Sequence, residues 1–171
     1  PLFEILGPHL LQGVLIAGPP ASGKTTVLRD ICRQISRGAL GKRIKTAVVD
    51  ERGEIAAVCN GIPQNDLGPC CDVLDGYPKG EGILQAIRCL SPQVVFCDEL
   101  GGWEETQAIQ QGVHAGVSLI ATIHAASFPQ LLKRPQARAL LETGAFSFVV
   151  RLGAGNQVGQ LAEWKRVGDL F

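Results

Sequence analysis

A glycine-rich run, GPPASGKTT at positions 18–26, constrains the fold of this chain more than any other feature. It follows a short apolar segment at 13–17 that suits a buried strand. It precedes a segment at 25–37 whose apolar residues recur at helical spacing. The run matches the pattern G-x-x-x-x-G-K-[ST]. A loop between such a strand and helix points backbone N–H groups at an anion, and glycines let the backbone approach it closely. We therefore predict a phosphate-binding loop.

The same loop predicts which residues contact a nucleotide and its metal ion. Lys24 is expected to reach the terminal phosphates and to act in catalysis, while the hydroxyl of Thr25 is expected to bind Mg²⁺. Ala21 stands where such loops often carry glycine, and we expect a small side chain to be tolerated there. The expected cofactors are ATP and Mg²⁺. ATP is favoured over GTP because the chain has no N-K-x-D element, the motif that reads guanine. The expected cofactor-binding residues are Gly18, Pro19, Pro20, Ala21, Ser22, Gly23, Lys24, Thr25 and Thr26.

Length and composition favour one globular domain over 1–171. Lys+Arg and Asp+Glu both number 16, and this balance argues against bulk attraction to nucleic acid. The six cysteines form no CxxC pair, which favours a reducing, cytoplasmic setting. No apolar stretch approaches the roughly 20 residues that span a bilayer, and no signal peptide opens the chain. Because the sequence starts at Pro1 without Met, we expect it to be the C-terminal part of a longer protein.

Apolar strands alternate with helical segments, which predicts an α/β fold with a mostly parallel sheet flanked by helices. Glycines at 153 and 155 separate the last strand from a final segment and predict a terminal β-hairpin. The long stretch from 51 to 79 is expected to be functional or to contain small elements of its own. The predicted strands are 13–17, 46–49, 94–97, 117–122 and 146–152, and the predicted helices lie near 25–37, 81–90, 103–115 and 136–143.

An acidic pair follows the apolar run at 94–97 and supplies the second half of a hydrolytic site. Asp98 and Glu99 are expected at the carboxyl end of a buried strand, where ligands bind in open α/β sheets. Asp98 is expected to hold Mg²⁺ together with Thr25, and Glu99 is expected to align the attacking water or accept its proton.

Two further segments are expected at the same edge of the sheet. Glu51 follows the strand 46–49 and is the alternative catalytic base, while Arg52 is open to phosphate contact or to pairing with Glu54. Thr122 and His124 end another strand, and either residue is a candidate for contacting the γ-phosphate or the attacking water. A histidine at that position is able to sense whether the terminal phosphate is present.

Several long segments, taken together, resemble the stage III sporulation protein AA family of bacterial sporulation ATPases. More distantly the chain is similar to the hexameric ATPases of type II and type IV secretion and pilus systems, in which an acidic box follows the second strand and a histidine box follows the strand after the Walker B strand. Asp50 to Glu54 and Thr122 to His124 occupy those places in this chain. Those distant relatives carry Gly-Glu where this chain has Asp98-Glu99. The matching stretches are GPPASGKTTVLRDICRQIS, VVDERGEIA, PQNDLGPCCDVLDGYPKGEG, SPQVVFCDELG and HAGVSLIATIHA.

The resemblance implies a P-loop NTPase fold of the RecA/AAA-like additional-strand class, with one strand between the P-loop strand and the Walker B strand. It implies a homo-oligomeric ring, such as a hexamer, that acts as a motor. The implied partners are membrane-embedded sporulation channel proteins, and the implied location is the cytoplasmic face of the membrane in the mother cell. A neighbouring subunit is expected to complete each site with an arginine, for which Arg52, Arg134 and Arg151 are the candidates.

Other functions remain open at this stage. A nucleic-acid-associated ATPase would use the basic residues between 29 and 45, although aromatic residues for stacking are scarce and no nucleic acid is expected. A small-molecule kinase would need an arginine-rich lid, and the segment after 152 offers only Lys165 and Arg166. A nucleotide switch without catalysis is the alternative if Glu99 is misplaced.

Overall fold

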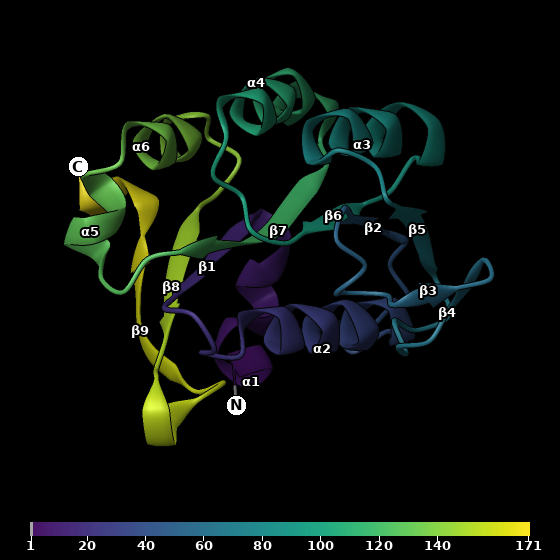
Figure 1. The fold of residues 1–171 in the computed structure, drawn as a ribbon, viewed down its shortest axis with the longest axis horizontal. Coiled ribbons are helices and arrows are strands. Elements are labelled where there is room, and N and C mark those ends of the chain that lie inside the picture. Colours follow the sequence, from purple (N-terminus) through teal and green to yellow (C-terminus); the bar gives the residue numbers. More distant parts are fainter. Residues whose placement is uncertain (1) are drawn as a thin grey trace.

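A computed structural model describes residues 2–171 and contains a seven-stranded sheet in the order β5-β2-β6-β7-β1-β8-β9. Every neighbouring pair is parallel except β8 and β9, which form the predicted C-terminal hairpin. Figure 1 shows helices on both sides of this sheet. The large strands are β1 (Val14–Gly18), β2 (Thr46–Asp50), β5 (Cys71–Asp75), β6 (Val94–Cys97), β7 (Ser118–His124), β8 (Phe148–Leu152) and β9 (Leu161–Arg166).

The helices form two layers because alternate residues of the central strands are buried on opposite faces. Val14 and Ile16 of β1 pack with α1 and α2, while Leu15 and Ala17 of the same strand pack with the other helices. In Figure 1 the helices α3, α4 and α6 accordingly lie across the sheet from α2. The helices are α1 (Leu2–Leu6), α2 (Lys24–Arg37), α3 (Lys79–Gln85), α4 (Trp103–Gly112), α5 (Phe128–Leu132) and α6 (Pro135–Glu142).

The order of the strands confirms the additional-strand fold. Strand β7 lies between the P-loop strand β1 and the strand β6 that precedes Asp98, and it pairs in parallel with both. The register places Gly18 beside His124 and Cys97 beside Ala121. The carboxyl ends of these strands therefore meet at one edge of the sheet, as the strand-end positions predicted.

The predicted elements are present, with shifted ends. The helix predicted near 81–90 begins at Lys79 and widens into π geometry over Ala86–Leu90, and β7 continues to His124 instead of ending at 122. The stretch 51–79 contains the short hairpin β3 (Val58–Cys59) and β4 (Ile62–Pro63) and then the edge strand β5. Helices α1 and α5, which the apolar pattern did not reveal, complete the described fold.

Candidate functional site

The glycine-rich loop links the end of β1 to the start of α2, as its flanking sequence predicted. Gly18 ends the strand in a crowded position, where an added Cβ would lie 2.4 Å from Ser22 Oγ. Gly23 has a φ of 84° directly before the helix, which is a left-handed conformation that glycine adopts without strain. Both glycines are therefore required by the shape of the loop.

Ala21 also adopts a left-handed conformation, with a φ of 57°. A residue with a Cβ pays about 1–2 kcal/mol in this region, which explains why such loops favour glycine there. The constraint at this position is thus the backbone angle, a factor that the size argument from sequence did not include.

Two side chains of the loop, those of Lys24 and Ser22, are candidates for binding a ligand. Lys24 is almost fully buried and donates from Nζ to the carbonyl oxygen of Pro19 at 2.8 Å. Burial lowers the pKa of its ammonium, while the charges of Asp98 and Glu99 act in the opposite direction. Ser22 Oγ is buried and has no hydrogen-bond partner among residues 2–171. An unpaired buried hydroxyl beside a folded-back lysine fits a loop that binds phosphate oxygens.

The expected metal pair is in contact. Thr25 donates from Oγ1 to Asp98 Oδ2 at 2.5 Å, which joins the start of α2 to the end of β6. The other oxygen, Asp98 Oδ1, accepts hydrogen bonds from Thr122 Oγ1 and, at 3.1 Å, from the backbone N–H of Glu99. A hydroxyl and a carboxylate oxygen are ligands that Mg²⁺ uses alongside substrate phosphates, so the donor set fits this ion.

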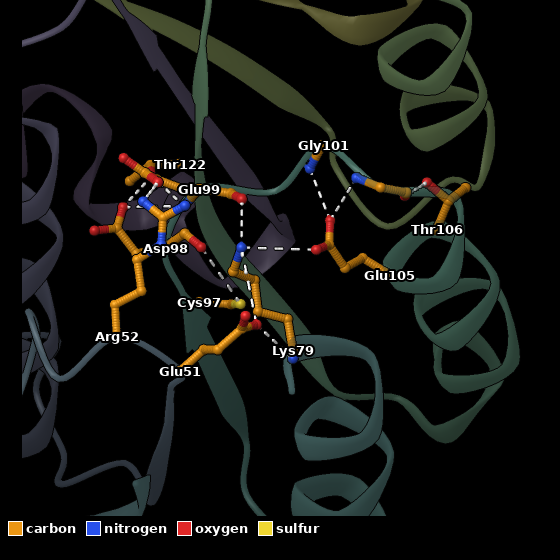
Figure 2. Close-up of polar contacts among 11 residues, drawn as sticks. Glu51, Arg52, Lys79, Cys97, Asp98, Glu99, Gly101, Glu105, Thr106 and Thr122 are labelled. Carbon is orange, nitrogen blue, oxygen red and sulfur yellow. Dashed lines mark hydrogen bonds and ion pairs between the residues drawn. The ribbon is translucent and has the colours of Figure 1, made fainter. Parts of the chain in front are cut away.

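Glu99 lies at the centre of a polar cluster (Figure 2). Its Oε1 is 2.9 Å from His124 Nε2, and its Oε2 pairs with Arg52 Nη1. Burial alone would raise the pKa of Glu99, but the hydrogen bond from His124 and the charges of Arg52, His124 and Lys79 together lower it. The carboxylate is therefore ionised at neutral pH. The structure thus brings Arg52, from the loop after β2, and His124, at the end of β7, together on the side chain that follows β6.

Residues 50–52, at and after the end of β2, each make a different contact. Asp50 is buried and accepts hydrogen bonds from the backbone N–H groups of Ile55 and Ala56 at 3.2 and 2.8 Å. Glu51 Oε2 accepts a hydrogen bond from the backbone N–H of Lys79 at 3.0 Å, at the start of α3. Arg52 pairs with Glu99, and not with Glu54, which was the alternative open from sequence. Asp50 and Glu51 thus both make structural contacts.

The candidate arginines lie in different places. Arg52 reaches Glu99, and Arg134 donates from Nη1 to the backbone oxygen of His124 at 2.6 Å. Arg134 also lines a pocket together with Pro19 and Pro20 of the phosphate loop of the same chain. Arg151 pairs with Glu163 across the C-terminal hairpin at 2.5 Å.

Sequence reasoning missed two contributors to the site. The hairpin between β8 and β9 contacts the phosphate loop, since the N–H of Gly159 donates to the backbone oxygen of Ser22 at 2.9 Å. Lys79 donates from Nζ to the backbone oxygen of Glu99 at 2.9 Å. Two signals included Lys79 without singling it out: the long stretch 51–79, expected to be functional or to contain small elements of its own, and the family-matching stretch at 63–82.

These features define a class of protein: the chain has the fold of a P-loop NTPase of the additional-strand class. Residues 4–167 match the family described as sporulation stage III, protein AA, and the chain belongs to that family. It is 43% identical over 167 residues to stage III sporulation protein AA of Bacillus subtilis (strain 168), covering 95% of this chain and 54% of that relative. The chain therefore spans about half the length of this relative.

Solved secretion ATPases share the fold. The ATPase DotB of Legionella pneumophila superposes with a TM-score of 0.68 at 16% identity, covering 98% of this chain and 48% of that chain. The VirB11 ATPase from the Brucella suis type IV secretion system gives a TM-score of 0.58 at 17% identity, covering 99% of this chain and 55% of that chain. At these identities the similarity establishes the fold. In the described residues, 2–171, no helix is long and apolar enough to cross a membrane.

Proposed function

We propose that this chain is the catalytic domain of a Mg²⁺-dependent ATPase. The observation that carries the proposal is the direct contact between the two halves of the site, Thr25 on the phosphate loop and Asp98 at the end of β6, with Glu99 next in sequence. The orphaned hydroxyl of Ser22 and the buried ammonium of Lys24 support phosphate binding at the same loop.

The residues divide the reaction as follows. Lys24 and the loop N–H groups would bind the phosphates, and Thr25 and Asp98 would hold Mg²⁺. The bound ion would neutralise developing negative charge on the phosphates. Glu99, ionised at neutral pH, orients the attacking water and accepts its proton. Glu51 is the weaker candidate for this base because its carboxylate already accepts a hydrogen bond at the start of α3.

Assembly and location form the second part of the proposal. The chain works as a homo-oligomeric ring, such as a hexamer, in which an arginine from a neighbouring subunit completes each site. The ring lies at the cytoplasmic face of the membrane in the mother cell and energises a membrane-embedded sporulation channel. Membership of the sporulation family and the fold shared with secretion ATPases support this part of the proposal.

A nucleotide switch is the second candidate function, and one observation favours it. The carboxylate of Glu99 contacts both His124 and Arg52, and these contacts occupy one acceptor site on each oxygen and compete with an attacking water in this conformation. A chain that kept these contacts with ATP bound would bind the nucleotide without cleaving it. A nucleic-acid-associated ATPase has less support, because Arg33, Arg37 and Lys45 of the basic segment pair with aspartates.

The experiment is Mg²⁺-dependent ATP turnover by this chain across a concentration series, with Glu99→Gln and the exposed neighbour Glu104→Gln as a matched control. We expect turnover per subunit to rise with concentration, to fall by about 10²–10⁴ in the Glu99 variant and to persist in the control. ATP binding without turnover at any concentration would favour the switch. Failure to bind Mg²⁺–ATP at all would contradict both candidate functions.

A further inference from the structure

Lys79 places a buried positive charge against the backbone that carries Glu99 (Figure 2). Its side chain is only 11% exposed, and its Nζ donates to the backbone oxygen of Glu99 at 2.9 Å. Glu105 Oε1 lies 3.7 Å from the same ammonium, and Glu51 Oε2 lies 4.0 Å from it. Burying an ammonium is costly unless it is paired and hydrogen-bonded, and these partners meet that need.

The segment 99–102, here called the Glu99 loop, is hydrogen-bonded to its surroundings along its whole length. Glu105 Oε2 accepts hydrogen bonds from the backbone N–H groups of Gly101 and Gly102, both at 2.7 Å. The N–H of Leu100 donates to the backbone oxygen of Thr122 at 2.8 Å. Lys79 therefore contacts the backbone of Glu99 and also the carboxylate of Glu105. Glu105 in turn contacts the backbone of Gly101 and Gly102, so the contacts form one network, as the dashed lines of Figure 2 show.

The backbone of Glu99 needs such support. Its φ of +53° lies in the left-handed region, which costs a residue with a Cβ about 1–2 kcal/mol. Conformations of this kind persist where the surroundings determine them on several sides. The N–H of Glu99 donates to Thr122 Oγ1 at 2.8 Å, and its carbonyl oxygen accepts from Lys79. These two bonds fix the direction in which the side chain leaves the backbone, toward His124 and Arg52.

We propose that Lys79, supported by Glu105, is a positioning residue that keeps the backbone of Glu99 in its left-handed conformation and aims the Glu99 carboxylate. The catalytic consequence rests on the proposed function, since a misaimed Glu99 matters only where Glu99 acts on water. The phosphate loop makes none of these contacts within the described part of the chain, so nucleotide binding should not depend on Lys79.

The first test separates turnover from binding. Lys79→Met keeps the length of the side chain and removes the ammonium; we expect kcat to fall by roughly 10- to 100-fold, because a general base contributes about 10²–10⁴. The Kd of Mg²⁺ with a non-hydrolysable ATP analogue should change less than about threefold. Lys42→Met is the matched control, because Lys42 is exposed and precedes β2 at the opposite end of that strand, and it should leave both quantities unchanged.

The second test does not need turnover. Backbone amide hydrogen exchange should speed up by about tenfold or more at Leu100 and Glu99 in Lys79→Met, while the amides of β1 keep their protection. Glu105→Ala should do the same at Gly101 and Gly102, and Glu104→Ala should not. Wild-type rates at the Glu99 loop in Lys79→Met would overturn the inference.

The two tests distinguish this inference from the proposed function. Wild-type protein that does not hydrolyse ATP would contradict the proposed function, and the exchange rates would still decide whether Lys79 holds the loop. Full turnover in Lys79→Met beside active wild-type protein would overturn the inference alone. Loss of protection throughout the sheet in that variant would show a general structural role and would likewise overturn it.

Discussion

The candidate site has two walls that the chain builds in different ways. The P-loop wall, residues 18–25, is one continuous stretch, and its shape follows mostly from backbone angles and crowding within the stretch, with one backbone hydrogen bond from Gly159 of the hairpin. The carboxylate wall combines residues 50–52, Lys79, the Glu99 loop and His124, which come from the ends of three strands and the start of a helix. Local geometry defines the first wall, whereas long-range polar contacts define the second.

This difference has a consequence for mutations. A change in the P-loop wall should act on nucleotide binding, because the residues that touch phosphate are the same residues that shape the loop. A change in the carboxylate wall should act on stability or on turnover and leave binding nearly intact.

Gly18→Ala should damage the P-loop wall most. The added Cβ would lie 2.4 Å from Ser22 Oγ, so the loop must shift. Overpacking of this kind costs about 1–3 kcal/mol, and we expect the Kd for Mg²⁺–ATP to rise by roughly 10- to 100-fold. Titration calorimetry measures the change. Gly168→Ala, where a Cβ meets open space, is the control and should bind as wild type does.

Asp50→Asn should act on stability and not on binding. The buried carboxylate accepts two backbone hydrogen bonds, and an amide is able to accept only through its one oxygen. Leaving a buried donor unsatisfied costs about 1–3 kcal/mol, so the free energy of unfolding in urea should fall by that amount. Asp75→Asn, at an exposed position, should not change it. A loss of ATP affinity in Asp50→Asn would break the separation of the two walls.

The smallest expected effect is a dependence of stability on pH. The pKa of Glu99 is lowered in the folded protein, so its contribution to stability is complete above the unfolded pKa of about 4.5 and is lost as pH falls through the folded value. The difference in unfolding free energy between wild type and Glu99→Gln should shrink as the pH falls below about 5. A difference that grows as the pH falls below about 5 would contradict the lowered pKa.

The sequence predicted the P-loop wall well because that wall is local. The loop, its flanking strand and helix, and the approximate bounds of the predicted strands all follow from spacing within short windows. The carboxyl-edge position of Asp98 and the contact with Thr25 follow from the parallel arrangement of the strands. The apolar pattern predicted a strand at 117–122, but the position of β7 between β1 and β6 was expected only through the family resemblance.

The carboxylate wall was harder to predict, for physical reasons. Whether Arg52 pairs with Glu54 or Glu99 depends on how the loop after β2 folds, and the spacing of charges along the chain does not contain that information. Lys79 contacts residues 20 and 26 positions further along the chain, Glu99 and Glu105. The left-handed backbone of Glu99 itself has no signature in sequence, because glutamate is not a residue that favours it.

The central claim is that Glu99, and not Glu51, serves as the base of an ATPase. The most direct measurement compares ATP turnover and ATP affinity in Glu99→Gln and Glu51→Gln under the same conditions. We expect Glu99→Gln to bind Mg²⁺–ATP with wild-type affinity while turnover falls by about 10²–10⁴. Glu51→Gln should retain turnover within a few-fold, because an amide oxygen is still able to accept the hydrogen bond from Lys79. Turnover that survives in Glu99→Gln and is lost in Glu51→Gln would contradict the claim.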